Sequence, residues 1–269
     1  MTSKAYLTID DSPSTRTDDL VCFLKQKKVP ALFFCRGEFL EQNLVMAVRI
    51  IQGGFHLANH AFSHRRASDL STEEMIDEIE KTEALIDRAY DLAYEKRPAQ
   101  RYFRFPHMDR GCGGWIVDYD GFQGNDLKDV KTCLTEGLNV ISMQRPNSEF
   151  EAKKRHIQKY LKEAGYTVPF SGVTHSWYNN PEIQEARDCL FTFSTCDWMV
   201  TQRHLGKWRY KSPDDLKQKI DLDRWLNKEN SVNIVLAHDQ AEIVDVTIGL
   251  VDHMLEKGIQ FLEISGGSN

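Results

Sequence analysis

Two adjacent aspartates close a short apolar run near the start of the chain, and two histidines four residues apart follow a later apolar run. The aspartates are Asp10 and Asp11, and the histidines are His60 and His64. Because successive side chains of an extended segment point to opposite sides, one carboxylate can bind a cation while the other stays free as a base. Imidazole nitrogen and carboxylate oxygen are zinc ligands, so the four residues predict a metal site that performs chemistry.

Other polar residues follow apolar runs in the same way. Arg104, Asp197 and His238 each lie at or just after the end of such a run. Taken alone, each has an ordinary structural role, such as an ion pair, a helix N-cap or a hydrogen-bonded loop residue. In parallel α/β folds, however, the carboxyl ends of the strands converge on one face, where active sites are built. The shared placement therefore indicates one site that combines these residues with the aspartate pair and His60.

The runs that carry these residues alternate with helical patterns along most of the chain. We expect strands at residues 6–9, 30–34, 55–58, 102–105, 166–174, 190–194, 232–236 and 259–264. We expect helices at residues 18–27, 39–52, 71–90, 151–164, 214–227 and 243–257, the third capped by Ser71 with Glu74. This repeated order favours a parallel sheet, either open or closed into a barrel. Residues 107–150 interrupt the order with glycines among polar and aromatic residues, which we interpret as a loop or an irregular insertion.

Length and composition are typical of one soluble globular domain. A single α/β barrel has about 250 residues, and this chain has 269, with 41% hydrophobic residues, 28% charged residues and a net charge of −6. No stripe of Lys and Arg indicates nucleic-acid binding, no apolar run is long enough to predict a transmembrane segment, and Met1 leads to the first strand without a signal sequence. We therefore expect a cytoplasmic protein whose six scattered cysteines are reduced, with its oligomeric state left open.

The chain resembles the polysaccharide deacetylases of carbohydrate esterase family 4, which share the NodB homology domain. Five motifs carry the resemblance, in the order that the family has them, whereas residues 107–190 match no motif. The motifs are Thr8-Ile9-Asp10-Asp11-Ser12-Pro13 for TFDDGP, Asn59-His60-Ala61-Phe62-Ser63-His64 for NHTWSH, Arg104-Phe105-Pro106-His107 for RxPY, Asp197-Trp198 at the end of DxxDW, and Leu236-Ala237-His238 for LxH.

The resemblance implies an α/β fold that is a distorted or incomplete (β/α) barrel of seven or eight strands. One catalytic domain would span residues 1–269, with an insertion at about 107–190 between the third and fourth motifs. It also implies that Asp11, His60 and His64 hold a divalent metal, with Zn²⁺ as the first expectation and Co²⁺, Ni²⁺, Mn²⁺ or Fe²⁺ as alternatives. Two imidazoles and one carboxylate leave positions for water and substrate, as hydrolytic metal sites need.

Proton transfer would fall to other motif residues. By the resemblance, Asp10 is the general base, and Arg104 keeps it ionised by charge pairing. His238 is the general acid for the leaving amine, and Asp197 supports its protonated state. Because every expected ligand and both proton-transfer residues are present, we expect an active enzyme rather than a pseudoenzyme.

The third, fourth and fifth motifs would also shape the substrate pocket. The backbone N–H of His107, which follows Pro106, would stabilise the oxyanion together with the metal. Trp198 and Leu236 would wall the pocket that receives the acyl methyl. Three positions depart from the family pattern: Ala61 replaces a Ser or Thr, His107 replaces an aromatic residue, and Ser194 replaces the outer Asp of the fourth motif.

These features predict a metal-dependent amide hydrolase that removes an N-acyl group, most simply acetyl, from an amino sugar or an amino-sugar glycan. Alternatives on this fold are removal of formyl or acetyl from a lipid-linked sugar and allantoinase-like opening of a cyclic amide. The non-enzyme alternative is a carbohydrate-binding module with a vestigial metal site. Unless the insertion only decorates the fold or forms oligomers, its aromatic residues would build a lid or wall that stacks on the sugar: Trp115, Tyr119, Phe122, Trp177 and Tyr178.

Overall fold

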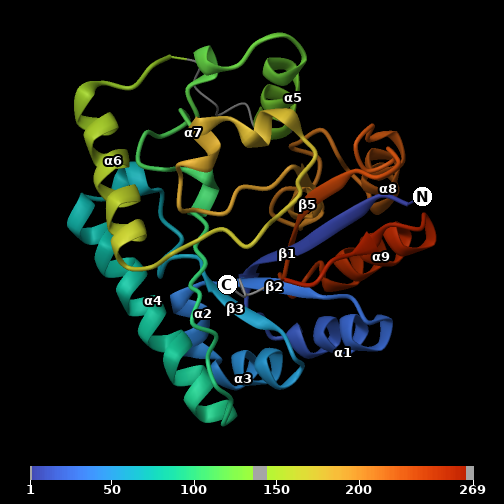
Figure 1. Ribbon diagram of the computed structural model, residues 1–269. Helices are drawn as coiled ribbons and strands as arrows, with labels where there is room; N and C mark the ends of the chain where they lie inside the picture. Colours follow the sequence, from blue (N-terminus) through green and yellow to red (C-terminus); the bar gives the residue numbers. More distant parts are fainter. Residues whose placement is uncertain (1, 136–143, 265–269) are drawn as a thin grey trace.

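Parallel strands surrounded by helices form the body of the protein in its computed structural model, which describes residues 2–135 and 144–264 (Figure 1). The strands pair in the order β3-β2-β1-β5-β4, and every pair is parallel. Their bounds are β1 Lys4–Ser12, β2 Ala31–Cys35, β3 His56–Asn59, β4 Phe193–Ser194, β5 Val232–His238 and β6 Gln260–Phe261.

Strand β1 is the centre of the sheet and is paired along both edges. One edge pairs with β5 from Lys4 to Asp10. The other edge pairs with β6 at Lys4 and Ala5 and then with β2 from Leu7 onward. The first motif therefore lies at the carboxyl end of the most extensively paired strand, where its backbone is firmly held.

The ring of strands is not closed by a continuous ladder among the described residues. Between β3 and β4, irregular chain completes it through a parallel bridge of Asn59 with Phe103 and a hydrogen bond of 2.7 Å from the Cys189 N–H to the Phe103 carbonyl oxygen. The expectation of an incomplete (β/α) barrel is thus confirmed, and the open side is the one that the insertion occupies.

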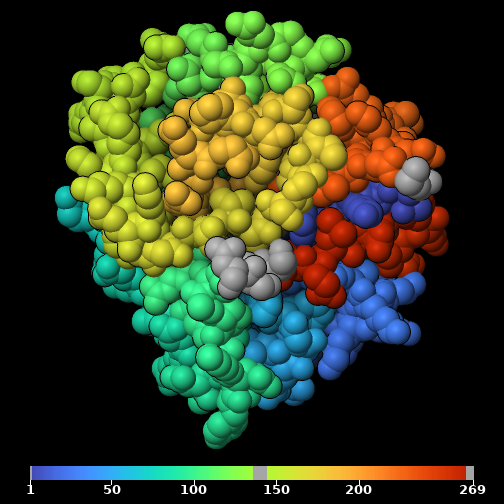
Figure 2. Space-filling view, viewed as in Figure 1, coloured from blue at the N-terminus to red at the C-terminus, as the bar shows by residue number. Residues whose placement is uncertain are grey.

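The helices form an outer ring. Neighbouring helices contact one another in the order α6, α4, α3, α1, α9, α8 (Figure 1). The longer helices are α1 Thr17–Lys27, α3 Leu44–Gln52, α4 Thr72–Ala93, α5 Gly124–Thr135, α6 Ser148–Glu163, α8 Pro213–Leu222 and α9 Val244–Glu256, and the short ones are α2 Gly37–Gln42 and α7 Pro181–Gln184. No helix within the described ranges is long and apolar enough to cross a membrane. In the space-filling view, the chain between α6 and β4 (yellow to gold) fills the gap between α6 and α8 (Figure 2).

Side-chain alternation along β1 separates two of the three clusters that form the core. Leu7 and Ile9 of β1 belong to a cluster with apolar residues of α1, α3 and α9, whereas Tyr6 belongs to a second cluster with residues of the insertion. Because the period of a strand is two, Thr8 and Asp10 share the side of Tyr6 and face the barrel interior. Burial of the outer face against the helix ring therefore directs Asp10 inward.

Several predicted elements differ from the observed ones. The strand expected at 102–105 and the one at 166–174 are reduced to isolated bridges, and the one at 190–194 is reduced to β4. The helix expected at 39–52 is interrupted at Asn43, whose ψ of 51° is not helical. The stretch 107–150, predicted to be irregular, contains α5, which buries Val130 and Leu134; residues 136–143 of that stretch lie outside the described part. For the segments on the open side of the barrel, tertiary contacts override local propensity.

Candidate metal centre and active site

The carboxyl ends of the strands surround a cavity of about 390 Å³. Of the residues predicted from the sequence, the cavity is lined by Asp10, Asp11, His60, His64, Arg104, His107, Trp198, Leu236 and His238. Asp197 and Pro106 do not line it: Asp197 lies fully buried behind His238, and Pro106 is buried beneath the turn that presents His107. Five motifs spread over more than 200 residues thus meet at one mouth.

The sequence predicts that the side chains of Asp10 and Asp11 point to opposite sides of the strand, and this prediction is wrong. Asp11 has a φ of 62°, and the pairing of β1 with β2 shifts register between Ile9 and Ser12. This turn brings both carboxylates to the same place, with Asp10 Oδ2 at 3.6 Å and Asp11 Oδ1 at 4.0 Å from His60 Nε2. A left-handed conformation is uncommon for a non-glycine residue and is typical of functional sites.

Asp11, His60 and His64 offer one ligand atom each within a space suited to one metal ion. The three atoms lie within 4.8 Å of one another, and Asp11 Oδ1 is 3.3 Å from His64 Nε2. Gln240 Nε2 donates to Asp11 Oδ2 at 2.7 Å, whereas the buried Oδ1 accepts no hydrogen bond from any described residue. A buried carboxylate oxygen without a donor is costly. A divalent cation between the two imidazoles would satisfy it, so these residues fit a metal.

The protonation states also suit metal binding. His60 Nδ1 donates to the Arg104 carbonyl oxygen at 2.8 Å, which leaves Nε2 as a lone-pair donor toward the cavity. Burial, with the charges of nearby cationic groups, lowers the pKa of His64 to about 2 and keeps this imidazole neutral although Asp11 opposes the shift. Burial alone would raise the pKa of Asp11, but the positive charges of protonated His238 and of Arg36 help to lower it, so Asp11 is ionised.

Two polar residues that the sequence analysis missed hold the loop between the histidines. Glu78 of α4 accepts hydrogen bonds from the backbone N–H groups of Phe62 and Ser63, at 3.1 and 2.7 Å, and from the Ser63 hydroxyl. Asn59 accepts from the Ala61 N–H at 3.0 Å and donates to Glu83 of the same helix at 3.0 Å. The long helix α4 therefore fixes the loop in place. The asparagine next to His60 was the sequence signal for this role.

Asp10 and Arg104 form a buried ion pair beside the three candidate ligands. Arg104 Nη1 donates to Asp10 Oδ1 at 2.6 Å and to the Thr8 hydroxyl at 2.9 Å, and its Nε donates to the Cys189 carbonyl oxygen at 2.7 Å. The guanidinium also lies over the ring of Phe34, 4.2 Å from its centroid. The pair leaves Asp10 Oδ2 free to face the cavity.

Asp197 orients His238 from behind. Its Oδ1 is 2.6 Å from His238 Nδ1, and its Oδ2 accepts from the His238 backbone N–H at 2.8 Å and from the Thr247 hydroxyl at 3.1 Å. Burial alone would lower the pKa of His238, but the charge of Asp197 and its hydrogen bond, with help from Asp11 and Asp10, raise it to about 9. His238 is therefore protonated at neutral pH, with Nε2 available to donate a proton.

The third motif forms a strained turn at the rim. His107 and Met108 have φ values of 55° and 57°, and the His107 ring lies 4.5 Å from that of His64. The His107 side chain is exposed at the rim, but partial desolvation and the charge of Arg66 lower its pKa, which favours the neutral imidazole. Its backbone N–H donates to no acceptor within residues 2–135 and 144–264. That donor is thus available for a ligand.

An aromatic group that the sequence analysis only partly anticipated walls one side of the cavity. Trp198 is in edge contact with His204 and Trp208, with centroids 5.1 and 5.5 Å apart. All three residues line the cavity, but only Trp198 belongs to a motif. The stretch that carries His204 and Trp208 is a series of turns without strand or helix periodicity, so nothing in it predicted this position.

The prediction that aromatic residues of the insertion form a lid is wrong for the five residues named. None of the five lines the site cavity, and only Trp177 lines a neighbouring cavity. All five are buried, at 1–6% exposure, in the core cluster that contains Tyr6: Trp115, Tyr119, Phe122, Trp177 and Tyr178. They stabilise the insertion against the open side of the barrel. The insertion reaches the cavity through Cys133 and Leu134, at the end of α5, instead.

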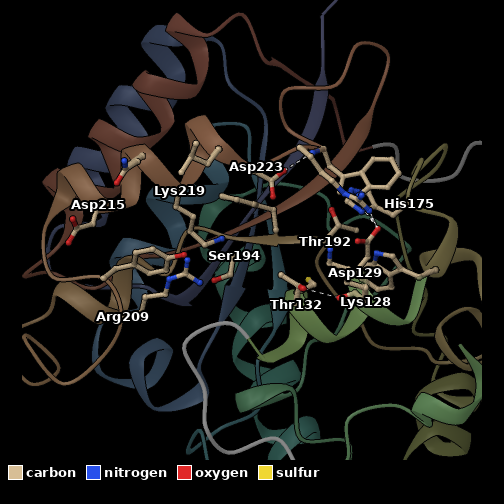
Figure 3. Close-up of a pocket in the computed structure, with 18 residues that line it drawn as sticks. Lys128, Asp129, Thr132, His175, Thr192, Ser194, Arg209, Asp215, Lys219 and Asp223 are labelled. Atoms are coloured by element: carbon tan, nitrogen blue, oxygen red, sulfur yellow. Dashed lines mark hydrogen bonds and ion pairs between the residues drawn. The ribbon is translucent and has the colours of Figure 1, made fainter. Parts of the chain in front are cut away.

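The second cavity, of about 530 Å³, shares Cys133 and Ser194 with the first. Figure 3 shows it between side chains of α5 and of α8, with Thr192 and Ser194 between the two groups. Two of its cationic side chains are engaged: Arg224 pairs with Asp129, and Lys219 lies 3.8 Å from the centroid of the Phe193 ring. Because no candidate ligand or proton-transfer residue lines this larger cavity, it is not the site of the predicted chemistry.

The fold and the smaller cavity together define an incomplete (β/α) barrel with a group of residues at its mouth that can hold one metal ion. Residues 2–111 match the family model described as polysaccharide deacetylase. A peptidoglycan-N-acetylglucosamine deacetylase from Bacillus cereus is 26% identical over 60% of this chain and 67% of its own length. A chitooligosaccharide deacetylase from Bradyrhizobium is 34% identical over 44% of this chain, which spans only 49% of that relative.

Solved structures share the fold over nearly the whole chain. A polysaccharide deacetylase from Bacillus cereus has a TM-score of 0.57 at 19% identity, with 99% of this chain and 94% of that chain covered. A family 4 carbohydrate esterase from Streptomyces lividans, in complex with acetate, has a TM-score of 0.56 at 17% identity, covering 98% and 94%. A family 4 pseudoenzyme from Bacillus anthracis has a TM-score of 0.54 at 17% identity, covering 98% and 64%. These structures show the shared fold, and the match of residues 2–111 to the family model, together with the curated relatives, confirms the resemblance to the polysaccharide deacetylases.

Proposed function

We propose that the protein is a metal-dependent hydrolase that removes an N-acyl group, most simply acetyl, from an amino sugar or a short amino-sugar glycan. One observation carries the proposal. Asp11, His60 and His64 converge on a single point, and a second carboxylate, Asp10, lies beside them with one oxygen paired to Arg104 and the other directed at the cavity. The names of the relatives, which are deacetylases of peptidoglycan and chitooligosaccharide, support the same class of reaction.

The metal would be bound by Asp11 Oδ1 and by Nε2 of His60 and His64, and we propose Zn²⁺ for this ligand set. When bound, it polarises the acyl carbonyl and makes a coordinated water more acidic. Asp10 Oδ2 accepts the proton of the attacking water, while Arg104 holds Asp10 ionised and in place.

His238 would donate a proton to the departing amine nitrogen. Asp197 makes this possible by fixing the ring and by favouring the imidazolium, in the manner of a carboxylate behind a catalytic histidine. The N–H of His107 would donate to the developing oxyanion, and Leu236 with Trp198 would enclose the acyl methyl. Each of these steps uses a side chain or N–H that lies at the same cavity.

The cavity suits a short substrate rather than a long polymer. Leu134 and Cys133 of the insertion lie on its wall, together with the aromatic residues Trp198 and Trp208 of the segment that follows the insertion. We therefore propose that the insertion narrows the groove to a pocket. The removal of acyl groups from small or lipid-linked amino sugars fits this shape as well as deacetylation of short glycans does.

Acetate release from N-acetylated chitooligosaccharides of increasing length, measured with and without added Zn²⁺, tests the proposal. We expect metal-dependent turnover that is already maximal with one to three sugars. No acetate from any N-acetyl sugar, in protein with a full equivalent of metal, would contradict the hydrolase assignment and favour a binding protein with a vestigial site. Turnover that rises steadily with chain length would contradict the closed pocket alone.

The activity should fall as the pH rises through about 9, because His238 acts in its protonated form and Asp197 raises its pKa to about 9. The bound dication will oppose protonation, so the alkaline limb of kcat/KM should lie at or below that pH. Asp197→Asn removes the charge that raises the pKa of His238, and the limb should move down toward or below neutral pH. The pH-rate profiles of the two proteins, with melting curves to confirm folding, measure this shift.

The ion pair of His238 with Asp197 also stabilises the folded protein in a pH-dependent way. The pKa of His238 in the folded state lies above its ordinary value of 6.5, so the stabilisation by this pair is complete below pH 6.5 and is lost as the pH rises through about 9. For the pH-rate profiles, an alkaline limb of kcat/KM that is unchanged in Asp197→Asn would show that a group other than His238 is the general acid.

A further inference from the structure

The cavity at the metal centre has an excess of positive side chains. Four arginines line it, Arg36, Arg66, Arg104 and Arg203, against two carboxylates, those of Asp10 and Asp11. The chain as a whole has a net charge of −6. A metal dication at Asp11 would make the imbalance larger. A cavity of one sign in a protein of the other sign concentrates ligands of opposite charge.

Two of these arginines are engaged by the protein. Arg104 forms the buried pair with Asp10 at 2.6 Å. Arg36 contacts Glu38 at 3.3 Å, and its guanidinium lies 4.0 Å from the centroid of the Phe39 ring. Both guanidinium groups therefore have charged or aromatic partners within the protein, although Arg36 Nε and Arg104 Nη2 are buried without a hydrogen-bond partner among the described residues.

Arg66 and Arg203 have no such partner. Neither forms an ion pair or a side-chain hydrogen bond with any residue in the described ranges 2–135 and 144–264. They come from separate segments: Arg66 lies just after the histidine loop, and Arg203 lies in the turns that also carry His204 and Trp208. Two unpaired guanidinium groups thus meet at one cavity from different parts of the fold.

We propose that the substrate carries an anionic group, a phosphoryl or a carboxylate, on or next to its N-acylated sugar, and that Arg66 and Arg203 bind this group. The proposal rests on the proposed function, because it concerns the substrate of that site. A guanidinium presents a planar fork of donors that matches two oxygens of a phosphate or a carboxylate. Arg66 is half-buried and Arg203 is exposed at the rim, so a neutral N-acetyl sugar would leave both guanidinium groups without a charge partner in the cavity, whereas an anionic one would pair with them.

The test compares matched substrates in wild-type protein and in Arg66→Ala and Arg203→Ala. The probes are N-acetylglucosamine as the neutral reference, its 1-phosphate and 6-phosphate, and N-acetylmuramic acid, which carries a carboxylate. In the wild type we expect at least about 10-fold higher kcat/KM for one of the anionic probes. Each substitution should reduce that preference about 10- to 100-fold, mainly through KM. The preference should also shrink as salt is raised.

Arg65→Ala is the matched control. Arg65 precedes Arg66 but is exposed, contacts the Asp69 carbonyl oxygen and does not line the cavity, so its loss should leave the preference unchanged. Whether the phosphates or the carboxylate gain the advantage identifies the anion. Equal kcat/KM for neutral and anionic probes would overturn the inference while leaving the proposed function intact.

Calorimetric titration of the same probes distinguishes failure of the proposed hydrolase function from failure of the inference that Arg66 and Arg203 bind an anionic group. If no probe is hydrolysed, the proposed function fails, and binding alone then decides the inference. Tighter binding of an anionic probe that is weakened in Arg66→Ala and Arg203→Ala would support it. Equal binding of neutral and anionic probes, or binding that the substitutions do not change, would overturn it.

Discussion

An Asp10→Asn protein should keep its metal and lose about 10²- to 10⁴-fold in kcat, because it loses the base that accepts the proton of the attacking water. The substitution preserves shape, and the amide oxygen of the new side chain can still accept the hydrogen bond that Arg104 Nη1 now donates to Asp10 at 2.6 Å. Arg104 is further held by Thr8 and by the Cys189 carbonyl oxygen, so we expect it to stay in place. Steady-state kinetics and elemental analysis of one preparation give both results.

The neighbouring substitution is the matched control for this experiment. Asp11→Asn makes the same chemical change one residue later, and asparagine tolerates the φ of 62° at that position. It should lose metal, whereas Asp10→Asn should not. Near-normal turnover in Asp10→Asn would show that the two aspartates have been assigned in the wrong order or that the reaction is different.

Removal of a candidate ligand should abolish stoichiometric metal binding while the protein stays folded. His60→Ala and His64→Ala each remove one of three ligand atoms that lie within 4.8 Å of one another. Loss of a residue that only supports a ligand costs about 10- to 100-fold in metal affinity, so loss of the ligand itself should cost more. Activity should fall with metal content. Metal per protein, measured after dialysis against a weak chelator, reports the change.

His156→Ala is the control for histidine loss, because His156 is exposed on α6, far in sequence from the motifs. It should bind metal as the wild type does. The ligand variants should keep cooperative melting curves, since the site lies at the barrel mouth and neither histidine belongs to any of the three core clusters. Full metal content in any two of the three ligand variants would contradict the ligand assignment.

The sequence predicted which residues meet at the cavity better than it predicted the elements that carry them. The apolar runs before Asp10 and His238 belong to the longest paired strands of the sheet, so their period was strong and placed both residues correctly at strand ends. The segment of Arg104 was also placed at the site, although it forms only a bridge with β3 and no strand. On that side the chain is held by single hydrogen bonds and by packing, neither of which leaves a period in the sequence.

The insertion shows the opposite case. Its aromatic residues predicted a surface that contacts sugar, but Trp115 and Trp177 are buried at 6% and 1% exposure. The sequence does not distinguish a tryptophan buried in a core from one that lines a binding pocket, because the residues packed around it decide its role. The residues that do reach the cavity from the insertion, Cys133 and Leu134, had no functional pattern.

By itself the sequence determined which side chains can bind a metal and move protons, and in which order they follow one another, because those properties belong to residue types and to short spacings. The tertiary structure alone decided where they meet. Asp10 and Arg104 are 94 residues apart, and the left-handed turn at Asp11 lies at the end of a strand that is paired on both edges. The unpaired Arg66 and Arg203 likewise become neighbours of the metal centre only through the fold. Contacts between distant segments are set by packing of the whole chain, which no local pattern records.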